Sequence, residues 1–147
     1  MSAATIAIAS DHGGYDLKQL LIEDLRAKGH EVLDLGTDGP ESVDYPDYAD
    51  LMAAAIKDGK AGRGILLCGT GIGISIAANR HPELRAALVH DALTARLSRL
   101  HNDANVIAMG GRILGIELAK DCLGVFLKTE FEGGRHARRV AKMSHAG

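Results

Sequence analysis

Cys68 is followed by glycines at every second position, in the stretch CGTGIG at residues 68–73. The GxGxG spacing differs from the GxGxxG of dinucleotide-binding folds, and the Gly-Lys-Ser/Thr of a P-loop is absent from this stretch. We therefore predict no nucleotide cofactor. A glycine-rich turn that begins a helix instead presents backbone N–H groups. These can bind a carboxylate or phosphate, or stabilise an oxyanion that forms during a reaction.

The thiol of Cys68 has two interpretations. Free cysteine is among the most buried residue types, so Cys68 can be a small apolar filler at the end of a strand. At the beginning of a helix the thiolate form is favoured, and a thiolate can act as a base or as a nucleophile. No arginine follows Cys68 at the CxxxxxR spacing of cysteine phosphatases. Cys122 falls on the apolar side of a predicted helix, and we predict that it is a core residue.

Asp11 and His12 belong to a second glycine-containing stretch, SDHGG, which also follows a predicted strand. An aspartate with two glycines is ordinary turn chemistry, so this stretch alone says little. Beside the thiol loop, however, Asp11 and His12 can act as an acid–base pair or contact a phosphate. No HxxxH or HExxH spacing occurs in the chain, so we predict no metal site.

Further residues whose side chains can take part in chemistry lie at the far end of a predicted helix. His101 and Asn102 follow a helix of about ten residues, which carries them roughly 15 Å from the thiol loop. They can be a helix C-cap. Arg135 and Arg139 are spaced i, i+4 and can bind one phosphate together, or belong to a solvated basic tail. If these residues act with the thiol, they serve the site of another subunit. An obligate dimer with composite sites follows as a hypothesis.

These residues are connected by alternating short apolar runs and helical patterns. The predicted strands are residues 5–10, 30–36, 63–68, 85–90 and 105–110. Helical patterns cover about residues 17–28, 46–59, 72–80, 91–100 and 116–126, and a basic segment closes the chain. In the fourth helix, Leu93, Leu97 and Leu100 share one face.

The alternation predicts an α/β fold: a Rossmann-like, doubly wound sheet of about five parallel strands flanked by helices, in a single domain over residues 1–147 with a C-terminal helix. In such sheets ligands bind beyond the carboxyl ends of the strands, where the thiol loop and the SDHGG stretch both lie.

The composition narrows the classes of function. The formal net charge is −2 and aromatic residues make up 3% of the chain, so binding to nucleic acid or to anionic membranes is not predicted. The first residues lack a basic segment and a long apolar run, which predicts neither a signal peptide nor a membrane span. Two cysteines far apart suggest no disulfide framework. We expect a cytoplasmic protein.

Five motifs in order resemble the type B ribose-5-phosphate isomerase family, whose wider group includes the galactose-6-phosphate isomerase subunits. They are SDHGG at 10–14, DYPDYA at 44–49, CGTGIGISIAANR at 68–80, HNDANVIAMGGR at 101–112 and FEGGRHARRV at 131–140. The resemblance covers essentially the whole chain. It implies an aldose–ketose isomerase of the pentose phosphate pathway, which works through an enediolate without metal or organic cofactor. It also implies a homodimer or homotetramer with sites shared between chains.

The same resemblance implies a role for each matching residue. Cys68 would move a proton between C1 and C2, and His101 would open the furanose ring. The remaining roles would be the enediolate loop with Gly69, Thr70, Gly71 and Gly73; Asp11 on a substrate hydroxyl or ring oxygen; His12, Arg112, Arg135 and Arg139 on the phosphate; and Tyr45 and Asn102 along the sugar. One branch of the family replaces the cysteine by a glutamate six residues further on. That position is Ile74 here, which indicates the cysteine branch.

Three rival functions remain open at this point. The chain can be an isomerase of another phosphosugar, such as a tetrulose, allose or galactose phosphate. It can be a non-catalytic module that binds a phosphosugar, although binding alone would not need the thiol. A thiol-dependent hydrolase is the third, and the missing CxxxxxR spacing opposes it.

Overall fold

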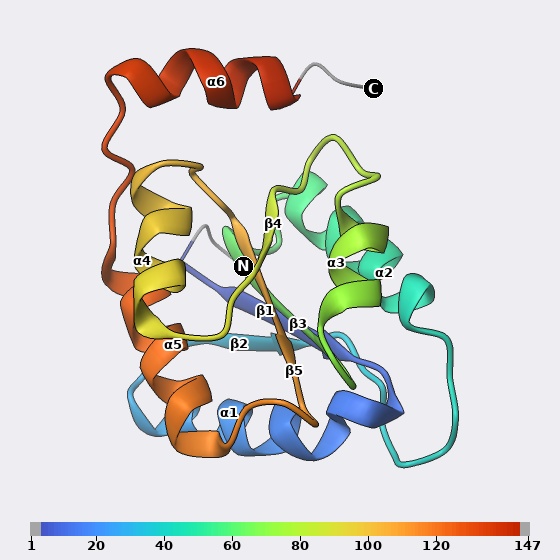
Figure 1. Ribbon diagram of the computed structural model, residues 1–147. Helices are drawn as coiled ribbons and strands as arrows, with labels where there is room; N and C mark the ends of the chain where they lie inside the picture. Colours follow the sequence, from blue (N-terminus) through green and yellow to red (C-terminus); the bar gives the residue numbers. More distant parts are fainter. Residues whose placement is uncertain (1–3, 145–147) are drawn as a thin grey trace.

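The protein is described by a computed structural model, in which residues 4–144 are placed (Figure 1). Five parallel strands form one sheet in the order β2-β1-β3-β5-β4. The strands are β1 (Ile6–Ser10), β2 (Val32–Asp34), β3 (Arg63–Cys68), β4 (Ala86–Leu88) and β5 (Val106–Gly110). Each lies within a predicted strand. The two edge strands are shorter than predicted and are only partly buried, because one side of each has no neighbour in the sheet.

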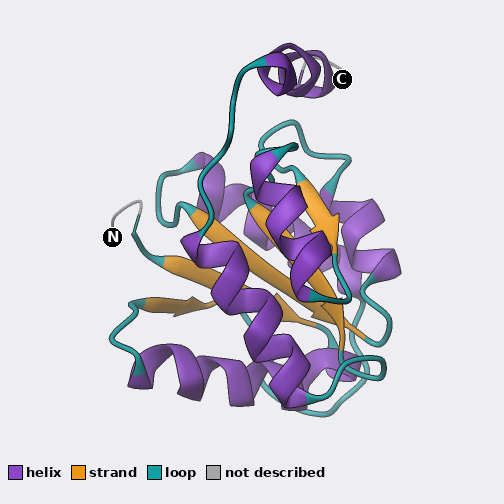
Figure 2. Ribbon diagram, turned by 60° about the vertical axis from the view of Figure 1, so that its left-hand side comes forward, coloured by secondary structure: helices purple, strands orange, loops and turns teal. Residues whose placement is uncertain are grey.

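Helices cover both faces of the sheet, which confirms the predicted doubly wound fold (Figure 2). They are the short 3₁₀ helix η1 (His12–Gly14), α1 (Tyr15–Ala27), α2 (Tyr45–Lys57), α3 (Ile72–Ala78), α4 (Ala92–Leu100), α5 (Ile116–Lys128) and α6 (Arg135–Ser144). Apolar residues of α1, α4 and α5 form one core with the sheet, and those of α2 and α3 form a second core on the other face. No helix within residues 4–144 is long and apolar enough to cross a membrane.

The three leucines that share one face of α4 are not its most buried residues. Leu93 is exposed, and the buried positions are Ala95, Ser98 and Arg99. Hydrogen bonds accompany the burial of Arg99: its Nε donates to the Thr129 carbonyl over 3.0 Å, and one terminal nitrogen donates to the Ala104 carbonyl and to Asp103, each over 2.8 Å. These bonds compensate the burial of a cation and so allow this face of α4 to turn inward.

The last helix, α6, lies apart from the two helical layers, beyond the amino ends of the strands (Figures 1 and 2). Among its residues that the structure describes, His136 is the buried one. The helix meets the rest of the chain through His136 in its first turn and through Met143 near its end, which lines a pocket with residues of the β4 edge.

Candidate active site at the carboxyl edge of the sheet

Three loops meet at the carboxyl ends of the central strands. Cys68 pairs with Gly110 in the sheet register, so the loops after β3 and β5 begin side by side. Backbone hydrogen bonds join them further, from the Gly111 N–H to the Cys68 carbonyl (2.8 Å) and from the Arg112 N–H to the Gly69 carbonyl (2.9 Å). The topology thus brings the SDHGG stretch, the thiol loop and the loop after β5 to one edge, as the position of parallel strand ends predicts.

The thiol of Cys68 is the centre of the second loop. Its side chain is 4% exposed, and its Sγ accepts a hydrogen bond from the Gly71 N–H over 3.2 Å. Gly71 has φ +80°, and a Cβ there would lie 2.8 Å from both the Leu88 Cδ1 and the Met109 carbonyl carbon. Only glycine fits this position, both for its backbone conformation and for its close approach to β5. This hydrogen bond directs a backbone donor at the sulfur and fixes the position of the thiol within the loop.

Thr70 and Gly73 complete the loop at the beginning of α3. The Thr70 Oγ1 accepts a hydrogen bond from the Ile72 N–H over 3.1 Å, and this side chain is exposed. Gly73 lies against Tyr45, because a Cβ at Gly73 would be 2.6 Å from the ring carbon that carries the tyrosine hydroxyl. The glycine spacing therefore makes room for an aromatic ring as well as for an anion.

Asp11 and His12 are both held by backbone groups. The Asp11 Oδ1 accepts hydrogen bonds from the N–H groups of Gly13 (2.8 Å) and Gly14 (3.2 Å), which is the predicted turn chemistry. The His12 Nδ1 accepts a hydrogen bond from the Val43 N–H over 3.2 Å, so a neutral His12 carries its proton on Nε2. One surface pocket is lined by residues of both SDHGG and the segment before α2: Asp11, His12, Ser42, Val43, Asp44, Tyr45, Pro46 and Asp47.

The guanidinium of Arg112 lies over Gly69. A Cβ at Gly69 would be 3.5 Å from the Arg112 Cζ, which places a cation beside the thiol loop. The carboxyl edge thus combines a thiol, N–H donors at the start of a helix, a carboxylate, an imidazole, an arginine and a tyrosine. Residues of these types can provide a base, stabilisation for an oxyanion and a contact for a remote anion.

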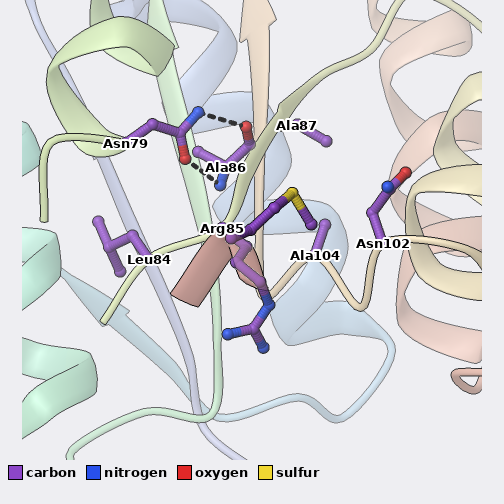
Figure 3. A pocket seen from close by; sticks show the side chains of 8 residues that line it. Asn79, Leu84, Arg85, Ala86, Ala87, Asn102 and Ala104 are labelled. Atoms are coloured by element: carbon purple, nitrogen blue, oxygen red, sulfur yellow. Dashed lines mark hydrogen bonds between the residues drawn. The ribbon is translucent and has the colours of Figure 1, made fainter. Parts of the chain in front are cut away.

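His101 and Asn102 lie at the other edge. Cys68 pairs with the last residue of β5, whereas His101 and Asn102 precede its first residue, Val106. The four steps from Val106 to Gly110 span about 13 Å at the usual rise of a strand. Asn102 lines a pocket at the β4 edge together with residues such as Asn79 and Arg85 (Figure 3). Within one chain these residues do not meet the thiol loop, as the length of α4 predicts.

The helix α6 lies at the same far edge as His101. The ring of His101 stacks on that of His136, with centroids 4.3 Å apart and an angle of 16° between the planes. Burial, followed by the neighbouring His101 and Arg135, lowers the pKa of His136 from its usual value. Arg135 and Arg139 are exposed in this helix. The sequence did not single out His136, although its place beside Arg135 in a matched motif was a usable signal.

The prediction that Cys122 is a core residue is confirmed. It is fully buried within the core formed by α1, α4 and α5. Burial and the nearby Asp121 and Asp91 raise the pKa of this thiol to about 11. Both cysteines are thus buried in an apolar core, but Cys68 lies at the carboxyl edge of its core, where its sulfur accepts a hydrogen bond from the Gly71 N–H.

Comparisons with known proteins give one consistent result. The model of the ribose/galactose isomerase family matches residues 6–143. Ribose-5-phosphate isomerase B of Escherichia coli is 47% identical, over 92% of this chain and 91% of that protein. D-erythrulose-4-phosphate isomerase of Pectobacterium atrosepticum is 48% identical, over 96% of this chain and 93% of its own length. The structure of Clostridium thermocellum ribose-5-phosphate isomerase B is 54% identical, covers 95% of both chains and superposes with a TM-score of 0.94.

Proposed function

The chain belongs to the ribose/galactose isomerase family, and from this membership and the carboxyl-edge site we propose that it interconverts ribose 5-phosphate and ribulose 5-phosphate. Its relatives include proteins named as sugar-phosphate isomerases of different substrates. The observation that carries the proposal is the Cys68 sulfur beside the N–H donors of a glycine loop, 3.2 Å from the Gly71 nitrogen.

In the proposed reaction the Cys68 thiolate removes the proton from C2 of the open-chain aldose. The electron pair of the C2–H bond forms the C1–C2 double bond of an enediolate, and the carbonyl oxygen on C1 takes the negative charge. The loop from Gly69 to Gly73, with Thr70, stabilises that oxygen through its N–H groups. The thiol then returns the proton to C1, and the proton of the O2 hydroxyl passes to O1, which gives the ketose.

Other side chains at the edge hold the substrate in place. Asp11 is fixed by two backbone N–H groups, and a carboxylate has further acceptor positions for a sugar hydroxyl or ring oxygen. His12 and Arg112 contact the phosphate, and Tyr45 lines the sugar. A remote phosphate anchor contributes binding energy that orients the reacting carbons.

Ring opening requires a second acid–base group, for which His101 is proposed. His101 and Asn102 lie at the far edge of their own chain, and so do Arg135 and Arg139 on α6. We therefore propose that they act in the site of a second subunit, in a homodimer or homotetramer. The separation of α6 from the helical layers supports this proposal, because its exposed arginines are free to face another copy.

Solvent exchange tests the proposed base. Ribose 5-phosphate is incubated with the protein in deuterated water, and NMR follows deuterium in the sugar and the appearance of ribulose 5-phosphate. Cys68→Ala is expected to lose several orders of magnitude in rate, whereas the matched variant Cys122→Ala keeps it. Unchanged exchange in Cys68→Ala would reject Cys68 as the base. Faster turnover of erythrulose 4-phosphate or of an allose or galactose phosphate would instead favour an isomerase of that sugar.

A further inference from the structure

Three side chains with metal-binding atoms meet where α4 ends and α6 begins. His101 follows α4, Glu132 lies in the segment between α5 and α6, and His136 belongs to the first turn of α6. One ligand atom from each lies within 4.8 Å of those from the other two. Two imidazoles and a carboxylate are a donor set that zinc accepts, with water as a fourth ligand.

The backbone that carries these ligands is anchored on both sides. The Glu132 N–H donates to the Leu100 carbonyl over 3.1 Å, directly before His101. The buried Arg99 holds the same segment through the Thr129 carbonyl. Figure 1 shows this segment rising past the end of α4 to the start of α6. The three ligands are therefore brought together by hydrogen bonds that do not depend on the ligands themselves.

A second observation points to a ligand at this place. The His136 side chain is 6% exposed, and its Nε2 is buried without a hydrogen-bond partner among the residues that the structure describes. Buried polar atoms nearly always have a partner. The other interaction of this ring is its stack on His101, which uses the ring face and leaves the nitrogen unsatisfied.

We propose that His101, Glu132 and His136 form a binding site for a divalent transition-metal ion of the zinc class, and that occupation of this site inhibits the isomerase by withdrawing His101. The inhibition rests on the proposed function, in which His101 opens the sugar ring. The metal site itself rests only on the cluster. The bound ion regulates the enzyme and takes no part in the reaction itself.

Binding requires the three side chains to move. Tetrahedral ligands at zinc distances lie about 3.3 Å from one another, and the ligand atoms here lie within 4.8 Å, so the separations must shrink by at most roughly 1.5 Å. The exposed Glu132 side chain can close this gap by rotation. The two rings must tilt out of their stack, because the lone pair of an imidazole nitrogen lies in the ring plane. The negative charge of Glu132 offsets part of the repulsion from Arg135 and Arg139.

Binding is tested with Co²⁺, which reports its own coordination, and by calorimetry with Zn²⁺. The full chain is expected to bind one ion and to show the visible bands of tetrahedral cobalt without a sulfur-to-cobalt charge-transfer band. The absence of the charge-transfer band shows that the cobalt is not bound by Cys68. Glu132→Gln and His136→Gln should each weaken binding by more than about tenfold. His30→Gln, which changes an exposed histidine elsewhere, should bind as the unmodified chain does.

Activity tests the inhibition. Zn²⁺ should inhibit isomerisation of the unmodified protein, and a chelator should restore it. Glu132→Gln should be active without metal and resist Zn²⁺. The proposed site would be overturned if the cobalt bands were absent. It would also be overturned if Glu132→Gln and His136→Gln bound the metal as tightly as the unmodified chain. Binding without inhibition would overturn the regulatory part and the role of His101. Binding by a chain that isomerises no sugar phosphate would refute the proposed function and the inhibition, but not the site.

Discussion

The N–H of Gly71 donates a hydrogen bond to the sulfur of Cys68 over 3.2 Å, from a residue whose φ is +80°. A side chain at this position would meet β5 at 2.8 Å. The conformation and the tight fit together direct the N–H at the thiol. The proton transfer proposed for Cys68 therefore depends on the backbone conformation of Gly71.

Gly71→Ala should therefore lower both stability and activity. A left-handed backbone costs an alanine about 1–2 kcal/mol, and the clash with Leu88 and Met109 displaces the loop from the thiol. Moving this N–H away from the sulfur is expected to lower kcat by about 10–100-fold, because a hydrogen bond to a charged group contributes about 1.5–3 kcal/mol. Gly59→Ala is the matched control, since Gly59 has φ +73° but open space around it. Urea unfolding should show a loss in both variants, and isomerase assays a loss in Gly71→Ala alone. Equal activities would contradict the coupling.

Gly73→Ala should affect the substrate through Tyr45. The new methyl group would lie 2.8 Å from the tyrosine hydroxyl oxygen, so the ring must move away from the sugar position proposed for it. We expect a higher KM, and we expect the effect to vanish when Tyr45 is already alanine, because the two changes act on one contact. Gly124→Ala, at an open position within α5, should leave KM unchanged and stabilise the protein by about 0.5–1 kcal/mol. Additive effects of Gly73→Ala and Tyr45→Ala would exclude this relation.

Two inactive variants should restore activity when their subunits exchange. If the proposed site joins Cys68 of one chain with His101 of its partner, Cys68→Ala and His101→Gln are each inactive alone. Random pairing makes half of the dimers mixed, and each mixed dimer has one intact site of two, which gives about a quarter of the full activity. The mixture is unfolded, refolded and assayed against each variant treated alone. A mixture as inactive as its components would show that both residues act from the same chain.

The two thiols should differ in alkylation. With a pKa raised to about 11, Cys122 has about one thiolate per thousand molecules at pH 8, and it is fully buried. Iodoacetamide should therefore leave Cys122 unmodified in the folded protein up to about pH 9. Cys68 should react first, and ribose 5-phosphate should slow that reaction. Peptide mass spectrometry locates the label, and early modification of Cys122 would contradict its place in the core.

The sequence determined the α/β architecture, because strand and helix periodicities are local and parallel strand ends must share an edge. The order of strands and helices along the chain is therefore enough to place Asp11, Cys68 and Arg112 on one edge. The length of one helix likewise determines that His101 lies far from Cys68 in its own chain. The buried face of α4 does not follow from its leucines, because Arg99 is buried through hydrogen bonds to carbonyl groups more than a turn away.

Only the tertiary structure decided how side chains remote in sequence approach one another. The fit of Tyr45 against Gly73 and the stack of His101 on His136 each join residues 28 or more positions apart, and both arise from packing between elements. The cluster with Glu132 has the same origin, because its ligands come from a helix end, a connecting segment and a separate helix. The spacing of residues in a motif predicts contacts within one segment of the chain. Sites of this kind instead form where segments remote in sequence pack against one another.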